Sequence, residues 1–371
     1  MRKVIFSLHL YLSLAAAIFV IILAVTGSII AFETELDHLF HAKLFYVTPE
    51  PQPLSLAEIR SAVEKAYPGE RIAAYTLARS PDLSYQVDIG KGTVYINEYS
   101  GEILGLVSEP DFATSALAFV HSVHIRLTPS PGGSDIGKQI VKWVDVIIVF
   151  LLFSGLYLWW RTKRWTLKKG TSGFRFWFDL HNTVGIFALF FLLLLATTGI
   201  ILGFDGTITP MFYQITGTQP ALVYSRQKFT SDPPSADAIP ISPDAAIAIA
   251  REALPGATPF SFIVPGPNDA YVFRTAYPED LTSGGRSQIV VHQYSGQVLG
   301  AEGSRTGPTG SRMVTTNRAL HTGDIFGLLS KAVLSLASLM MVAQAATGVM
   351  MWWRRKRRKQ TVNPQSAGEI A

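Results

Sequence analysis

Residues 4–32 read VIFSLHLYLSLAAAIFVIILAVTGSIIAF, a nearly continuous apolar run. About 20 apolar residues are enough to cross the hydrocarbon core of a bilayer as a helix. The apolar core of a cleavable secretion signal is only about 7–15 residues long. The run therefore predicts a membrane helix that is kept in the mature protein.

Three further apolar blocks follow at residues 140–160, 176–204 and 325–353, so we expect four membrane-spanning helices. Of the 371 residues, 48% are hydrophobic and only 16% are charged, and the mean hydropathy is +0.26. Two long polar connectors separate the first block from the second and the third from the fourth. The expected fold class is an α-helical membrane bundle of four transmembrane helices with two small α+β domains.

The net charge of +5 is concentrated in three short basic clusters beside the apolar blocks. The clusters are Arg2-Lys3, the group Arg161, Lys163, Arg164, Lys168, Lys169 and Arg175, and the run Arg354–Lys359. Four spans place all three on one side of the membrane, and the positive-inside rule assigns that side to the cytoplasm. We expect a bacterial inner-membrane protein with both termini in the cytoplasm, basic clusters on anionic lipid, and no bound nucleic acid.

These patterns divide the chain into eight segments. The expected membrane helices are residues 1–33, 138–161, 176–204 and 323–353. The expected periplasmic domains are 34–137, which includes a connecting helix, and 205–322, and the expected cytoplasmic parts are a basic loop (162–175) and a basic tail (354–371). In each domain a helix pattern (Ser55–Ala66, Ser242–Ala253) precedes a pair of alternating strands with a tight Ser-Gly turn. Each domain therefore reads as a small α+β module.

The two halves of the sequence match segment by segment, which predicts an internal duplication. The matching segments are His9 with His181, Thr26-Gly27 with Thr198-Gly199, Ser154-Gly155 with Thr347-Gly348, Trp159-Trp160 with Trp352-Trp353, and Val94–Gly105 with Ile289–Gly300. Pairs of small residues let membrane helices approach closely. We interpret the hydroxyl–glycine pairs in this way.

Four histidines occupy matching places in the two halves: His9 with His181 near the cytoplasmic helix ends, and His124 with His321 just before the second and fourth helices. Ionisable groups inside a membrane protein are costly unless they have a task. Two imidazoles that face each other across a bundle can hold a six-coordinate haem iron. The helical rise separates the two levels by about 30 Å, so we expect one haem near each leaflet. Capping of interfacial helix ends is the alternative.

The chain has no cysteine, which excludes disulfides, thiolate iron–sulfur clusters and covalently attached c-type haem. The order of its motifs resembles the PepSY-associated transmembrane proteins, a group that contains ferric-siderophore reductases and iron-uptake factors. The motifs are Leu8-His9, Thr26-Gly27 with Glu33, His124, Ser154–Trp160, Asp179-Leu-His181, Thr198-Gly199, Leu320–Gly323 and Thr347–Trp353. Ser13 departs from the glycine that the family usually has four residues after the first histidine, whereas Gly185 keeps it.

The resemblance implies haem b in the bundle and reduction of a ferric siderophore in the periplasm with release of Fe(II), and the two histidine levels predict two haems. The electron donor would be a cytoplasmic reductase or a membrane quinol, because no nucleotide-binding motif is visible. His121, Arg126, Arg312 and Arg318 are further candidates for contact with substrate. A component that transports haem or siderophore iron, a non-redox PepSY sensor or assembly factor, and a homo-oligomer stay open as alternatives.

Overall fold

The structure is a computed structural model. It describes residues 1–129, 135–163, 165–167, 173–225, 228–233, 235, 237–282 and 284–362, with side chains of the last helix up to residue 357. Of the expected basic clusters, Arg164, Lys168 and Lys169 lie outside the described residues, and Arg358 and Lys359 outside the described side chains. The chain divides into two compact units. One consists of Met1–Glu33, Ala116–Gly206 and Asn317–Ala371, and the other of Thr34–Ser115 and Thr207–Thr316.

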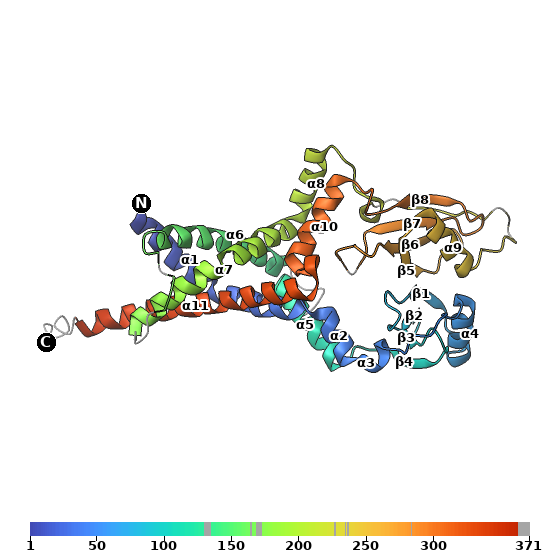
Figure 1. Cartoon of the computed structure of the whole chain (residues 1–371), viewed down its shortest axis with the longest axis horizontal. Helices are drawn as coiled ribbons and strands as arrows, with labels where there is room; N and C mark the ends of the chain where they lie inside the picture. Colours follow the sequence, from blue (N-terminus) through green and yellow to red (C-terminus); the bar gives the residue numbers. More distant parts are fainter. Residues whose placement is uncertain are drawn as a thin grey trace. The chain divides into compact units, whose positions relative to one another are not determined.

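The first unit is a bundle of four long helices. These are α1 (Arg2–Ile30), α6 (Asp135–Trp159), α7 (Gly173–Gly203) and α11 (Leu328–Val362). Each contains a stretch that is long and apolar enough to cross a membrane, so the expectation of four such helices is confirmed. The helices run side by side in Figure 1, with α1 and α7 each packed against both α6 and α11.

Apolar side chains point both into and out of this bundle. Val20, Ile148 and Ala196 belong to a buried cluster between the helices. Large side chains on the outside, such as Phe153 and Phe190, are 56% and 69% exposed. A helix that is apolar on all sides is suited to lipid on its outer face, so the outward-facing phenylalanines fit a membrane environment.

Short connecting helices precede or follow the four long ones, and the sequence predicted only the one before the second long helix. They are α2 (Glu33–Phe40), α3 (Ala42–Phe45), α5 (Phe112–Arg126), α8 (Asp205–Thr216), α10 (Thr309–Thr322), and the 3₁₀ turns η1 (Leu222–Tyr224) and η2 (Asp324–Phe326). The fourth long helix begins at Leu328, not at the expected residue 323. Gly323 has a φ of 81°, which ends α10 in a left-handed conformation before the chain can start again as a helix.

The second unit is built on one antiparallel sheet of eight strands in the order β4-β3-β2-β1-β5-β6-β7-β8. The strands are β1 (Ile72–Thr76), β2 (Tyr85–Ile89), β3 (Gly92–Ile96), β4 (Ile103–Val107), β5 (Thr258–Ile263), β6 (Tyr271–Ala276), β7 (Ser287–Val291) and β8 (Val298–Glu302). The sequence pattern predicted a strand pair in each half, and the structure has four strands in each. β1 pairs with β5, so the first module (β1–β4) and the second module (β5–β8) share one sheet.

One helix of each module packs on this sheet, as the sequence predicted. α4 (Leu56–Ala66) begins at Ser55, whose hydroxyl accepts the amide N–H of Glu58, and α9 (Pro243–Ala253) begins at Ser242 in a similar way. The buried apolar side chains of both helices belong to a single core with alternating residues of the strands, such as Ile59 and Phe262. The common core and the contact between α4 and α9 show that both helices cover the same face of the sheet.

Candidate functional site

Two of the four histidines contact a hydroxyl group of a neighbouring helix of the bundle. The Nδ1 atom of His9 on α1 lies 2.8 Å from Ser154 Oγ on α6. The Nδ1 atom of His181 on α7 lies 2.9 Å from Thr347 Oγ1 on α11. Because Nδ1 of each imidazole is engaged by a hydroxyl, Nε2 is the nitrogen available to a metal.

The other two histidines repeat this contact. His124 Nδ1 on α5 and His321 Nδ1 on α10 each lie 3.0 Å from a threonine hydroxyl, that of Thr26 on α1 and that of Thr198 on α7. Burial, with the charge of His321 as a smaller cause, lowers the pKa of His124 to about 3, and burial lowers the pKa of His321 to about 4. Both rings are therefore neutral, which is the form that ligates metals.

A glycine follows each of these hydroxyl residues, and the imidazole lies against it. A Cβ atom on Gly27 would come within 2.8 Å of His124 Cε1, and one on Gly199 within 3.2 Å of His321 Cε1. The corresponding distances are 3.3 Å from Gly155 to His9 and 3.9 Å from Gly348 to His181. The hydroxyl–glycine pairs therefore hold the four histidines, a role beyond the helix packing that the sequence suggested.

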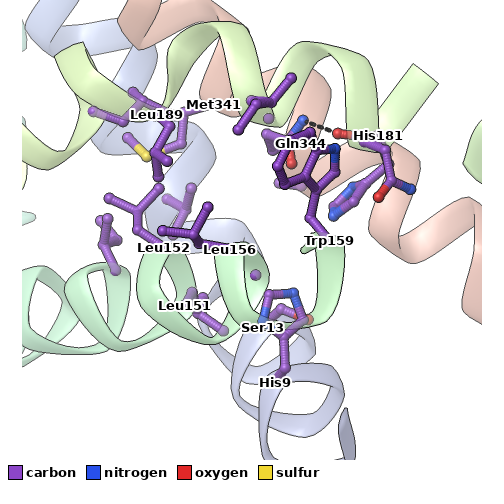
Figure 2. Close-up of a pocket in the computed structure, with 18 of the residues that line it drawn as sticks. His9, Ser13, Leu151, Leu152, Leu156, Trp159, His181, Leu189, Met341 and Gln344 are labelled. Carbon is purple, nitrogen blue, oxygen red and sulfur yellow. Dashed lines mark hydrogen bonds between the residues drawn. The ribbon is translucent and has the colours of Figure 1, made fainter. Parts of the chain in front are cut away.

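A cavity lies between α1, α6, α7 and α11, and both His9 and His181 line it. The rest of the lining is largely apolar, with leucines, Met341 and Trp159 (Figure 2). Gln344 also lines it and donates from Nε2 to the backbone carbonyl of His181 at 2.8 Å. The two histidines that the sequence paired thus come from different helices and line the same cavity.

The lining of this cavity fits a haem. A b-type haem needs a wide apolar space and axial imidazoles whose other nitrogen is hydrogen-bonded, and His9 and His181 meet that requirement. Among the described residues, no group of three or more His, Cys, Asp or Glu side chains could hold a bare metal ion.

The remaining predicted residues lie around the second pair of histidines. His121 Nδ1 is 2.6 Å from Glu33 Oε2, and this hydrogen bond raises the pKa of His121. The positive charge of Arg318 lowers the pKa of both His121 and His321, which places its side chain near both rings. The backbone carbonyl of Arg126 packs against Gly137 of α6.

Sequence reasoning missed two groups at the site. The four hydroxyl residues were predicted only as packing residues, although each contacts a histidine. Asp145 on α6 was not singled out, and its carboxylate lies close to Gly199, where His321 also lies. Asp145 could have been identified from the sequence, because it is an acidic residue within an apolar block.

The fold and site define a membrane protein of four apolar helices that carries an antiparallel sheet domain and holds four histidines in its helical unit. The family model described as the PepSY-associated TM region matches residues 6–355, so the chain belongs to that family. No curated protein matches the chain.

Proposed function

We propose that this protein is a haem b electron-transfer protein of the bacterial inner membrane that reduces ferric siderophores in the periplasm and releases Fe(II). The observation that carries the proposal is the arrangement of four histidines, each held through Nδ1 by a hydroxyl of another helix. The apolar cavity between His9 and His181 supports it. The membrane family and the four spans are consistent with it.

In this proposal His9 and His181 would hold one haem, and His124 and His321 the other. A bound haem supplies a carrier for one electron at a time. The protein's own task is to fix the imidazole rings through the hydroxyls, to exclude water with apolar walls, and to set the potentials. No nucleophile and no acid–base pair are required, because the ferric substrate only gains an electron.

We also propose an orientation for the protein in the membrane and a tandem duplication as the origin of its two halves. The basic ends of the helices are assigned to the cytoplasm, and the sheet domain to the periplasm. Arg357 lies 3.7 Å over the ring of Trp353 at the end of α11, a contact suited to a lipid interface. The matching His–hydroxyl contacts and the helix with four strands in each half support a tandem duplication.

The test is the visible spectrum of the detergent-purified protein, first oxidised and then reduced with dithionite, with a pyridine haemochrome count. We expect about two haems b per chain with sharp reduced bands, and re-oxidation of the reduced haems by a ferric siderophore. A red protein that passes haem to an acceptor without redox turnover would favour a transport role. A colourless protein that cannot take up haem would favour the sensor or assembly role.

The role of the hydroxyl groups in holding the histidine rings can be tested with two neighbouring threonines on α7. Thr197 and Thr198 each donate to the carbonyl four residues earlier at 2.7 Å, but Thr198 also contacts His321. Replacement of Thr198 by valine should lower haem affinity about tenfold to hundredfold, because the ring orientation is lost. Thr197→Val is the matched control and should leave the affinity unchanged. The measurement is haem transfer to a scavenging globin, and equal loss in both variants would reject the role.

A further inference from the structure

An acidic side chain lies inside the membrane bundle next to the second histidine pair. Asp145 is on α6, within one of the four spans. Its Oδ2 atom lies 2.9 Å from the place that a Cβ on Gly199 would take, and His321 Cε1 lies 3.2 Å from the same place. The carboxylate and the imidazole therefore meet at one point of α7.

This carboxylate has no compensating charge within the part of the chain that the structure describes. In those residues no lysine, arginine or histidine forms an ion pair with Asp145, and no donor hydrogen-bonds to it. Asp179, the acidic residue near His181, differs because its carboxylate lies 3.7 Å from Arg175 Nε. An acid within a membrane span is costly and points to a functional role.

The matching position in the second half of the sequence shows that packing does not require an acid. Aligning Ser154 with Thr347 places Ser338 of α11 on Asp145. Ser338 is buried and donates to the carbonyl of Ala24 at 3.0 Å, one turn before the glycine that supports His124. The second histidine pair is thus flanked by a carboxylate on one side and a hydroxyl on the other.

We propose that Asp145 is a tuning residue that lowers the reduction potential of the haem held by His124 and His321, an inference that rests on the proposed function. The ferric form of a haem carries one more positive charge than the ferrous form. A carboxyl group nearby loses its proton more readily beside the ferric form, and the resulting carboxylate stabilises that form strongly in a low-dielectric surround. The described lining of the other cavity contains no acidic residue, so the two haems should titrate at separate potentials.

The experiment is a spectroscopic redox titration of the full-length protein in detergent. In Asp145→Asn, the lower-potential haem should move upward by about 59 mV or more, a tenfold change in its ferrous-to-ferric ratio, while the other haem stays in place. The double variant Asp145→Ser with Ser338→Asp puts the acid on the other side of the same pair. It should bring the potential back down, which a purely structural role of Asp145 would not do.

The outcomes separate this inference from the proposed function. If wild type and Asp145→Asn each bind two haems, and the potentials in the variant equal those in wild type, the tuning role is wrong and the proposed function stands. If Asp145→Asn loses the haem, the double variant decides, because it should regain both haem and the low potential if charge is what matters. A wild-type protein that cannot bind haem would overturn both ideas at once.

Discussion

Replacing His9 with alanine should halve the haem content of the purified protein from about two groups per chain to about one. His9 and His181 line the same cavity from α1 and α7, and each is held through Nδ1. Without His9, the haem would be held by one imidazole only, and the cavity wall would lack a side chain that binds it. The pyridine haemochrome count and the reduced spectrum would measure the change.

Three companion variants make this result specific. His181→Ala should remove the same haem, and the double variant His9→Ala with His181→Ala should lose no more than either alone. His292→Asn is the matched control, because Asn97 takes the corresponding place in the first module and accepts the same backbone N–H two residues on. If His9→Ala and His181→Ala removed different haems, the pairing would be wrong.

Much of the helical unit could be predicted because membrane helices leave a direct signal in the sequence. The apolar blocks predicted α1, α6, α7 and α11, and the matching histidines paired His9 with His181, which line one cavity. Most of the connecting helices could not be predicted in the same way, because they are short and mixed in composition. The role of Ser154 and Thr347 was hidden, because small residues at a helix contact are usually there for packing.

The union of the two modules into one sheet also lay beyond the sequence. The pairing of β1 with β5 joins residues nearly two hundred positions apart, such as Tyr75 with Phe262, whose rings stack with centroids 5.1 Å apart. Alternation along each strand shows which face is buried but not which edge finds a partner. The sequence predicted two small modules, each with its own strands, and the structure shows that these strands form one continuous sheet.

A second large effect should be a dependence of the first module's stability on pH that is set by Glu98. This side chain is 2% exposed, and its Oε2 atom accepts no hydrogen bond from the described residues. The turn that carries it is anchored by Tyr99, whose hydroxyl donates to the carbonyl of Pro81 at 2.8 Å. The corresponding Tyr294 donates to the carbonyl of Pro267 at 2.7 Å.

The second module has Gln293 in the place of Glu98. Its Nε2 atom donates to the carbonyls of Gly266, Pro267 and Asp269 at 2.6, 3.0 and 2.7 Å. A carboxylate cannot donate, so Glu98 could make the contacts that Gln293 makes, with the carbonyls of the corresponding loop at residues 80–83, only when it is protonated. In agreement, burial raises the pKa of Glu98 from 4.5 to about 7.

The titratable neighbours of Glu98 do not favour its ionisation. The negative charge of Glu98 raises the pKa of its neighbours Tyr85 and Tyr99. Arg251 and Asp244 of α9 act on Tyr85 with opposite signs, and Asp82 and Glu50 add negative charge near Tyr99. Among the described residues, no cation forms an ion pair with Glu98. Burial therefore determines whether Glu98 is protonated.

The sign of the effect follows from the raised pKa. The folded module keeps a proton that the unfolded chain releases above pH 4.5, so stability falls as pH rises from about 4.5 to about 7 and is flat beyond that range. At about 1.4 kcal/mol per pH unit, the loss is on the order of 3 kcal/mol. The carbonyl loop at residues 80–83 should loosen first, together with Val47, whose N–H donates to Asp82 O.

Hydrogen exchange of the full-length protein in detergent at pH 5 and pH 8, corrected for intrinsic exchange rates, would measure this. Glu98→Gln should restore protection of residues 80–84 at pH 8 and remove the dependence on pH, because an amide donates at every pH as Gln293 does. Gln293→Glu should transfer the same dependence to the loop at residues 266–269 of the second module. Identical profiles for wild type and Glu98→Gln would show that Glu98 is ionised in the folded protein and that its loop is held by other contacts.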